Sequence, residues 1–340
     1  YIAPGNPGTA ELGENIDINP LDFDKLKETV IGKDVELVIV GPEEHLVKGL
    51  HDFFLEDKDL KSIPVIGPSR RGAMLEGSKD FAKDFMMRHG VPTARYKSFR
   101  AHQREAASRF LHTLQPPYVL KADGLAAGKG VIICSTINEA IVNLNTMLDG
   151  QFGKASETVV IEEYLHGIEL SVFVLTDGNS YVMLPEAKDY KRIGEGDTGP
   201  NTGGMGAISP VPFADKEFMC KVEEQVVKPT IQGLLTDGIS YKGFIFIGLM
   251  NQEGMPKVIE YNVRLGDPEA QVVLPRLKND LLDLLSLTAQ SKLHQAKVEF
   301  FPLTASAVIL VSGGYPGDYT KGLPIQMPQS LSLIHISEPT

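Results

Sequence analysis

The segment with the clearest chemical potential is KADGLAAGKGV, residues 121–131, which combines two lysines with three glycines. Apolar runs on either side, residues 117–120 and 131–134, predict two strands joined by this loop. Glycines let backbone N–H groups turn toward an anion, and lysines supply charge that offsets a triphosphate. We therefore expect a hairpin that closes over nucleotide phosphates. The contacting residues would be Lys121, Gly124, Gly128, Lys129 and Gly130.

This loop differs from the common phosphate loop, G-x-x-x-x-G-K-[ST], which opens a helix. Gly124 and Gly128 are one residue too close, and Gly130 stands where the metal-binding hydroxyl belongs. A strand rather than a helix follows. The segment therefore predicts a nucleotide site of another architecture.

A second polar cluster lies on the predicted strand around residues 258–263. Glu260, Asn262 and Arg264 alternate with apolar residues, so their side chains share one face of a strand. A carboxylate and an amide oxygen suit a hard cation that bridges phosphates, and an arginine suits a carboxylate or phosphate. The alternative is a solvated sheet face with an exposed ion pair. We favour the metal site because Ile259 and Val263 mark the opposite face as apolar.

The run Glu162, Glu163, Tyr164 and Leu165 ends another predicted strand, and Glu169 follows it. A strand that leaves a lobe can offer backbone groups to an adenine edge, while Glu169 can accept from ribose hydroxyls. Acidic residues are common at strand ends, so this pattern alone is a weak signal.

Residues 188–206 form an expected long polar loop rich in Gly, Asp and Asn. Long loops in compact domains are often functional. Its backbone donors suit a substrate carboxylate or a developing acyl phosphate.

The elements that position these groups predict more than one domain. Strands at residues 35–40 and 63–66 flank a helix at 45–56, which indicates a parallel, doubly wound sheet. Ligands on such sheets bind at the carboxyl ends of strands, where residues 5–9 and 41–43 lie. Tight-turn chemistry alone is the alternative for these two segments.

A small α+β lobe of antiparallel strands is expected over residues 78–188, followed by a larger lobe over 189–324. The larger lobe contains a predicted helix at 215–235, strands at 241–250 and 256–263, a helix at 279–291 and a strand at 305–311. The expected domains are therefore 1–77, 78–188 and 189–324, with an unrelated or disordered tail at 325–340.

Composition limits the class of protein. The 340 residues carry a formal charge of −11, which disfavours partners such as nucleic acid or an anionic membrane. Two cysteines without metal spacing predict reduced thiols, and no zinc cluster or nucleophile elbow is expected. We expect a cytoplasmic enzyme, monomeric or else dimeric.

Taken together, these segments resemble the ATP-grasp superfamily and, within it, the phosphoribosylamine–glycine ligase family. The resemblance implies an ATP-grasp fold, α/β and α+β, with an N-terminal doubly wound parallel-sheet domain. It spans about Tyr1 to Leu323. Its segments are PGN at 4–6, VGPE at 40–43, EGSK at 76–79, the loop at 121–131, DTGPNTGGMG at 197–206, EYN at 260–262, RLGDPE at 264–269 and GGYPGD at 313–318.

The resemblance implies ATP-dependent joining of glycine to 5-phosphoribosylamine through glycyl phosphate, with ATP and Mg²⁺ or Mn²⁺ as cofactors. Implied catalytic residues are Arg264, Lys121 and Asp189. Implied ATP contacts are Lys79, Lys121, the loop glycines with Lys129, and Glu162, Glu163, Tyr164, Leu165 and Glu169. Implied metal ligands are Glu260 and Asn262. Implied substrate contacts are Gly5, Asn6, Gly8, Thr9, Gly41, Pro42, Glu43, Asn201, Thr202, Gly203, Gly204, Arg264, Gly266 and Asp267.

The sequence departs from the family pattern in three places. The family's first strand and its Gly-Gly-Arg-Glu-His loop would precede Tyr1, and the tail from about Gln329 is unrelated to the family. Lys188-Asp-Tyr190 stands where Gln-Asp-His is more usual. We therefore expect a fragment whose ATP and metal site is more complete than its ribosylamine site.

Three alternatives remain open. Another ATP-grasp ligase or carboxylase would activate bicarbonate, formate or a different amino acid. A non-catalytic remnant would bind ATP and metal without turnover. A structural or interaction protein would not need Glu260, Asn262 and Arg264 on one face beside two lysine–glycine segments.

Overall fold

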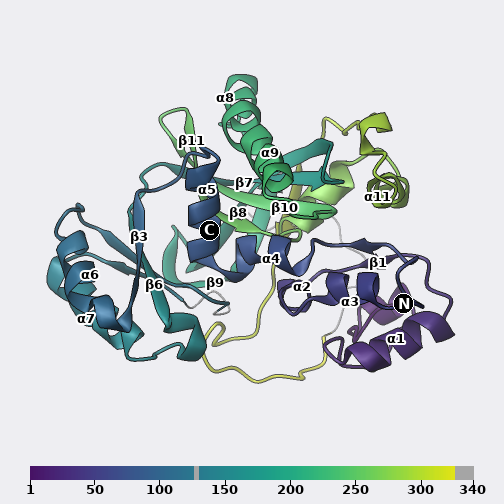
Figure 1. Cartoon of the computed structure of the whole chain (residues 1–340), viewed down its shortest axis with the longest axis horizontal. Coiled ribbons are helices and arrows are strands. Elements are labelled where there is room, and N and C mark those ends of the chain that lie inside the picture. The colour runs from purple at the N-terminus through teal and green to yellow at the C-terminus, as the bar shows by residue number, and fades with distance from the viewer. Residues whose placement is uncertain (126–129, 326–340) are drawn as a thin grey trace, which may run out of the picture.

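The structure is a computed structural model that describes residues 1–125 and 130–325. Its described strands form a two-stranded, a four-stranded and a six-stranded sheet. Figure 1 shows the four-stranded lobe at one end of the molecule and the N-terminal helices at the other, with the six-stranded sheet between them. No helix within these residues is long and apolar enough to cross a membrane.

The N-terminal part of the chain carries the two-stranded sheet. Its two strands pair in parallel, which confirms the doubly wound arrangement expected from the sequence. Both strands are shorter than predicted. Its elements are the 3-10 turn η1 (Thr9–Glu11), α1 (Phe23–Gly32), β1 (Val38–Ile39), α2 (Glu43–Val47), α3 (Leu50–Glu56) and β2 (Val65–Ile66).

The single helix predicted over residues 45–56 is wrong, because the chain forms two helices there. Gly49 separates α2 from α3 with a φ of +96°, a conformation that glycine adopts at little cost. Leu46, Leu50 and Phe54 are nevertheless buried, so the apolar spacing identified the core face correctly.

The small lobe is an antiparallel sheet in the order β3-β6-β4-β5, covered by two helices that share its apolar core. Its elements are β3 (Tyr96–Arg100), η2 (Ala101–Gln103), α6 (Arg104–Leu111), β4 (Tyr118–Ala122), β5 (Val131–Cys134), α7 (Ile137–Leu148), η3 (Gly153–Ser156) and β6 (Thr158–Glu163). The pairing of β4 with β5 confirms the predicted hairpin.

The six-stranded sheet has the order β11-β10-β7-β8-β9-β12. Its strands are β7 (Ile168–Thr176), β8 (Tyr181–Gly194), β9 (Thr198–Ser209), β10 (Gly243–Gln252), β11 (Met255–Asn262) and β12 (Ala305–Val308). Its helical elements are α8 (Lys216–Val222), the π-helical turn η4 (Glu223–Val227), α9 (Lys228–Thr236), α10 (Ala270–Val273), η5 (Leu274–Arg276), α11 (Leu281–Ala289) and η6 (Leu293–Gln295).

Two predictions about these strands are wrong. Residues 188–206 are not an open loop, because most of them lie in the long antiparallel hairpin β8–β9. Strands β7 and β8 pair within the six-stranded sheet, whereas the sequence analysis placed them in the small lobe. Strand pairing therefore favours a lobe boundary between β6 and β7, and the exact domain limits stay a proposal.

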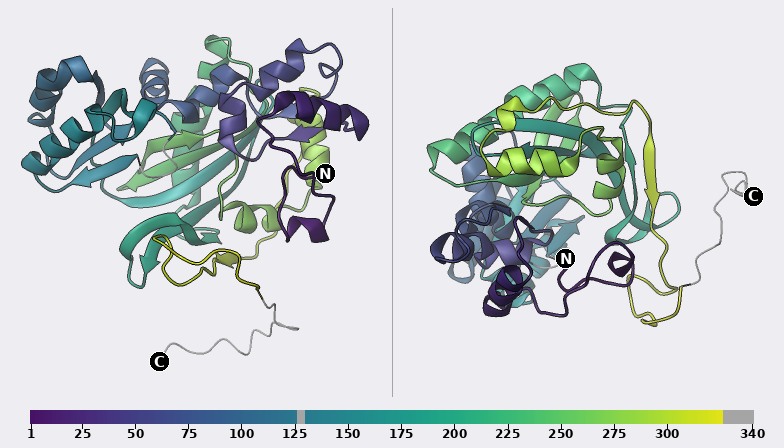
Figure 2. Two further views of the ribbon diagram at one scale, coloured as in Figure 1. Left: turned by 90° about the horizontal axis from the view of Figure 1, so that it is seen from below. Right: turned by 90° about the vertical axis from the view of Figure 1, so that its right-hand side faces the viewer.

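The segment after β12 lies beside the β8–β9 hairpin (Figure 2). The Ile309 amide donates to the Met205 carbonyl at 2.9 Å, and the Gly203 amide donates to the Tyr315 hydroxyl at 3.3 Å. These contacts position the C-terminal part of the described chain next to the glycine-rich strand β9.

Helices α4 (Arg70–Gly77) and α5 (Lys79–Arg88) connect the parts of the molecule and lie near its centre in Figure 1. Ser78 ends α4 and begins α5, and its hydroxyl accepts from the Phe81 amide at 3.1 Å. Such a side-chain cap satisfies a backbone donor that the first helical turn leaves unpaired.

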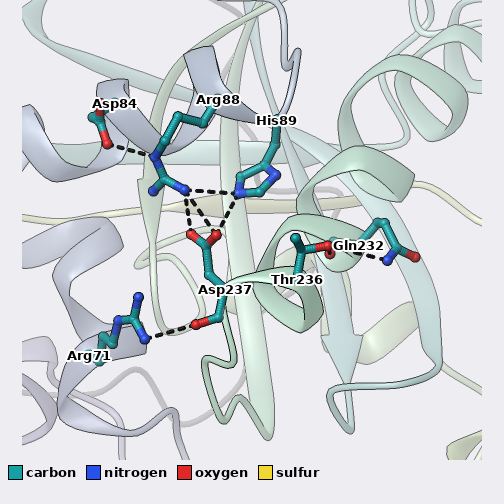
Figure 3. Close-up of polar contacts among 7 residues, drawn as sticks. All are labelled: Arg71, Asp84, Arg88, His89, Gln232, Thr236 and Asp237. Carbon is teal, nitrogen blue, oxygen red and sulfur yellow. Dashed lines mark hydrogen bonds and ion pairs between the residues drawn. The ribbon is translucent and has the colours of Figure 1, made fainter.

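A polar cluster joins the C-terminal end of α5 to the end of α9 (Figure 3). Arg88 donates through Nη1 to both carboxylate oxygens of Asp237, at 2.9 and 2.8 Å. His89 Nε2 lies 3.1 Å from Asp237 Oδ1, and Arg71 donates to the Asp237 carbonyl at 2.8 Å. Asp237 therefore fastens the end of α9 to α4 and α5.

We expect Asp237→Asn to lower the free energy of unfolding by about 1–2 kcal/mol at pH 7, because it removes the charge from partly buried hydrogen bonds. Burial alone would raise the pKa of Asp237, but the bonds from Arg88 and His89 outweigh it and lower that pKa. This stabilisation is present above the ordinary value of 3.8 and is lost as the pH falls through the lowered pKa. Urea unfolding of native and variant chains from pH 7 to about 2 measures the difference.

The matched control is Asp84→Asn, which breaks an exposed pair between the same Arg88 and a residue one turn earlier on α5. Exposed pairs at this spacing contribute about 0.3–0.5 kcal/mol. Equal losses in the two variants would contradict the role assigned to Asp237.

Candidate active site

A cavity of about 610 Å³ lies where α4 and α5, the small lobe and the six-stranded sheet meet. Thirteen of the predicted site residues line it. They are Glu43, Lys79, Lys121, Gly130, Glu162, Asp189, Asn201, Thr202, Gly203, Glu260, Asn262, Arg264 and Asp267. Segments more than 200 residues apart in the chain therefore contribute to one site.

A buried charged cluster, formed by Lys83, Lys121 and Glu162, lines this cavity. Glu162 Oε2 lies 3.0 Å from Nζ of Lys83 and 3.0 Å from Nζ of Lys121. All three residues are at least 95% buried. Burial alone would raise the pKa of Glu162, but the charges of Lys121 and Lys83 outweigh it and lower that pKa, which keeps the carboxylate ionised.

Lys79 lies at the start of α5, where the chain meets the β4–β5 hairpin. Its Nζ donates to the Gly124 carbonyl at 3.3 Å, and its amide donates to the Asp123 carbonyl at 3.1 Å. Burial lowers the pKa of the Lys79 ammonium. The Gly130 carbonyl accepts from Ala122 at 2.7 Å and closes the described base of the hairpin. The predicted contacts Gly128 and Lys129 lie outside the described residues.

Glu260 and Asn262 occupy alternate positions near the end of β11, and both line the cavity. Since side chains two residues apart on a strand point to the same face, their oxygens form a hard donor pair. Tyr261 between them is 2% exposed and packs in the core. This donor set would fit a divalent ion, which Glu260 and Asn262 would hold.

Arg264 follows the end of β11 and contacts three side-chain acceptors, and its Nη1 also donates to the Leu265 carbonyl at 3.2 Å. Its guanidinium lies 3.4 Å from Glu43 Oε2, 3.1 Å from Glu76 Oε1 and 3.3 Å from Asn262 Oδ1. Burial raises the pKa of Glu76 to about 7 despite the nearby arginine. Arg264 is thus held at the cavity by α2, α4 and β11, and one of its five N–H donors, on Nη1, has no acceptor among the described residues.

The β8–β9 hairpin contributes the opposite wall. Lys191 Nζ lies 3.6 Å from Asp189 Oδ2 and 3.5 Å from Glu169 Oε2. Gly204 has a φ of +130°, and a Cβ there would lie 2.4 Å from Pro268 Cδ. Glycine at this position therefore lets β9 approach the segment that carries Asp267.

Several predicted contacts are not among the residues that line this cavity. Glu169 instead pairs with Lys191, and the Glu163 carboxylate accepts from the Arg95 amide at 3.0 Å. The predicted contacts that do not line this cavity stay predictions. They are Gly5, Asn6, Gly8, Thr9, Gly41, Pro42, Gly124, Glu163, Tyr164, Leu165, Glu169, Gly204 and Gly266.

The sequence analysis gave no role to five polar residues that line the cavity, namely Glu76, Lys83, Lys191, Glu269 and Tyr315. Two of them carried a usable signal. Lys83 lies four residues after Lys79 and therefore on the same face of α5, and Lys191 lies two residues after Asp189 on one strand. The other three lie in the family segments at 76–79, 264–269 and 313–318, although local spacing alone gives none of them a role.

Glu269 is 4% exposed, and burial, followed by the charge of Asp189, raises its pKa to about 7. Between the ordinary value of 4.5 and about 7, the folded carboxyl holds a proton that the unfolded chain releases, so stability falls as pH rises through this window. Between pH 4.5 and 7.5, the free energy of unfolding of Glu269→Gln is expected to rise by up to ~3 kcal/mol relative to that of the native chain. Urea unfolding at both pH values, with exposed Glu157→Gln as control, measures this gain. The same pH dependence of the free energy of unfolding in Glu269→Gln and the native chain would contradict this prediction.

Family models and relatives match almost the whole described chain. The N domain of phosphoribosylglycinamide synthetase matches residues 1–76, and its ATP-grasp (A) domain matches residues 77–270. The phosphoribosylamine–glycine ligase of Chlorobaculum tepidum is 46% identical over 327 residues, which cover 95% of this chain and 76% of that protein. The phosphoribosylamine–glycine ligase of Vibrio cholerae is 43% identical, over 100% of this chain and 80% of that protein.

Solved structures agree with the sequence matches. The crystal structure of phosphoribosylamine–glycine ligase from Thermotoga maritima has a TM-score of 0.81 and 35% identity, covering 96% of this chain and 78% of that one. A biotin carboxylase domain from Hydrogenobacter thermophilus, solved with MgADP, has a TM-score of 0.61 at 21% identity. The match covers 81% of this chain and 59% of that chain. The second likeness concerns the fold alone.

A small antiparallel lobe over a larger sheet, with lysines and a carboxylate–amide pair around one cavity, defines an ATP-grasp enzyme. These are ligases that couple ATP cleavage to bond formation. Within that class the chain belongs to the phosphoribosylglycinamide synthetase family, the phosphoribosylamine–glycine ligases.

Proposed function

We propose that the residues of this cavity carry out the family's reaction, the ATP-dependent synthesis of glycinamide ribonucleotide in purine biosynthesis. The observation that carries this proposal is the convergence of Lys121, Glu260 and Arg264 on one cavity from three separate segments. The monomeric state and the cytoplasmic location expected from the sequence stay predictions.

In the first step a carboxylate oxygen of glycine attacks the γ-phosphorus of ATP. The bond to the bridging oxygen breaks, and ADP leaves with its electrons. In the second step the amine of phosphoribosylamine attacks the carbonyl carbon of glycyl phosphate, phosphate leaves, and the amine loses a proton. Neither step needs a covalent enzyme intermediate, so positioning and charge stabilisation account for catalysis.

Lys79 and Lys121 provide the positive charge that the ATP phosphates require. Both lysines line the cavity. Lys121 lies on β4 of the β4–β5 hairpin, and Lys79, at the start of α5, donates to the Gly124 carbonyl just after β4. Glu162, at the end of β6, has a buried Oε1 atom without a hydrogen-bond partner among the described residues. That oxygen is a suitable acceptor for the amino group of adenine.

Glu260 and Asn262 would hold Mg²⁺ or Mn²⁺, which when bound polarises the phosphoryl oxygens and offsets their charge. Both ligands present oxygen, the donor that these ions prefer. Among the described residues no group of three or more His, Cys, Asp or Glu is placed to hold a metal without a substrate.

Arg264 would bind the glycine carboxylate through two parallel hydrogen bonds after releasing one of its present acceptors, and its charge would stabilise the acyl phosphate. Asp189, which is 9% exposed at its side chain, lies across the cavity on β8 and suits the ammonium group of glycine. Asn201, Thr202 and Gly203 offer donors and acceptors for the ribosylamine.

Interception of glycyl phosphate tests this proposal. With glycine, ATP and Mg²⁺, hydroxylamine in place of phosphoribosylamine is expected to yield glycine hydroxamate and ADP in equal amounts. ADP formed with bicarbonate or formate, and no glycine hydroxamate, would instead show another ATP-grasp activity. Nucleotide binding without any ADP would show a non-catalytic remnant.

A further inference from the structure

Lys83 is a buried lysine in the cavity that the reaction outlined above does not use. Its side chain is 2% exposed, and its ammonium donates to Thr93 Oγ1 at 2.7 Å and lies 3.0 Å from Glu162 Oε2. A buried lysine needs a compensating interaction, since an unpaired ammonium is costly to remove from water. Lys83 therefore has a defined electrostatic role.

The cluster of Lys83, Lys121 and Glu162 carries two positive charges and one negative charge. Both ammonium groups approach the same carboxylate oxygen, at 3.0 Å each, while Oε1 has no described partner. Among the described residues, no second carboxylate lies within ion-pair distance of either ammonium, so the cluster keeps one positive charge for a ligand. An anion that enters the cavity supplies the missing counter-charge.

The cluster also connects the two lobes. Lys121 donates to the Ile259 carbonyl at 3.4 Å, and Thr93 Oγ1 donates to the Val258 carbonyl at 2.7 Å. Both carbonyls belong to β11, directly before the proposed metal ligand Glu260. The excess charge therefore lies beside the place where the metal and the phosphates would meet.

We propose that Lys83 is a positioning residue of the nucleotide site, which neutralises Glu162 so that the charge of Lys121 stays available to the phosphates of ATP. The inference rests on the proposed ATP site and adds the requirement for a third lysine. Without Lys83, Glu162 and Lys121 form a neutral one-to-one pair, and a phosphate has to compete with the carboxylate for the Lys121 ammonium.

The test separates phosphate binding from adenosine binding. Calorimetry with Mg²⁺ compares ADP and adenosine on the native chain and on Lys83→Met. The variant is expected to bind ADP about 10- to 100-fold more weakly, which corresponds to the loss of one charge-assisted contact. Its affinity for adenosine is expected to stay within about threefold of the native value, because the adenine and ribose contacts are unaffected.

Charge rescue distinguishes this role from simple packing. In the double variant Lys83→Met/Glu162→Gln, the competing carboxylate charge is gone, so the preference for ADP over adenosine is expected to return toward the native ratio. Lys97→Met, which removes an exposed lysine from β3, is the control. If the Met variant fails to fold, Lys83→Gln, which keeps a donor toward Thr93, provides the same comparison.

Unchanged ADP affinity in Lys83→Met would overturn the proposal. Equal losses of ADP and adenosine affinity, without rescue in the double variant, would also overturn it, because they would show general damage to the cavity. A native chain that binds neither ligand would refute the nucleotide site itself, which is a separate result.

Discussion

Replacing Glu260 with glutamine is expected to slow ADP formation by about 1,000-fold, equivalent to roughly 4 kcal/mol of transition-state stabilisation. Glutamine has the same shape and keeps an oxygen in place, but it lacks the charge that holds a divalent ion. Glu260 is half-buried near the C-terminal end of β11 and glutamine has nearly the same volume, so the fold should be preserved. Steady-state ADP release across a Mg²⁺ titration measures the effect.

The control is Glu253→Gln, at the turn between β10 and β11, which removes the same charge from an exposed position outside the cavity. It is expected to behave like the native chain. A Glu260→Gln variant that keeps native turnover and a native dependence on Mg²⁺ would rule out Glu260 as a metal ligand.

Arg264→Lys is expected to lower kcat/KM for glycine by about 100-fold, because lysine keeps the charge but cannot make two parallel bonds to a carboxylate. Lysine also cannot contact Glu43, Glu76 and Asn262 together, as the guanidinium does. Kinetics with glycine as the varied substrate, together with direct ATP binding, locate the defect.

Arg109→Lys, on the exposed face of α6, is the matched control and is expected to leave both measurements unchanged. The account requires ATP affinity to stay near the native value in Arg264→Lys. A selective loss of ATP affinity with normal use of glycine would place Arg264 at the nucleotide instead.

Local patterns predicted much of this site because they depend on strand geometry alone. Glu260 and Asn262 face the cavity because alternate residues of a strand share a face, and Lys121 enters it from the predicted hairpin. The family resemblance supplied what spacing does not, namely that these segments lie together around one nucleotide.

Long-range contacts explain what the sequence analysis missed. The spacing of Lys83 from Lys79 predicts a shared helix face only, whereas its ion pair forms because β6 brings Glu162 to 3.0 Å from it. Glu269 follows a proline turn, and burial in the folded chain, followed by the charge of Asp189 on β8, raises its pKa. Such environments arise from pairing between distant strands, which a local pattern does not contain.

The glycine-rich segment before Gly206 misled the prediction for a related reason. Glycine and asparagine usually indicate a loop, yet here β9 pairs with both β8 and β12. A Cβ at Gly206 would lie 2.5 Å from the Ala307 carbonyl oxygen, so glycine there permits close strand approach. The glycine-rich composition of this segment therefore occurs in a paired strand of the β8–β9 hairpin rather than in an open loop.

The most direct test of the central claim is ADP release by this chain with ATP and Mg²⁺, measured with glycine and phosphoribosylamine together and with each one omitted. The account predicts sustained turnover only when both substrates are present, with glycinamide ribonucleotide formed in a one-to-one ratio to ADP. ADP release that does not depend on glycine, or product formed without phosphoribosylamine, would contradict it.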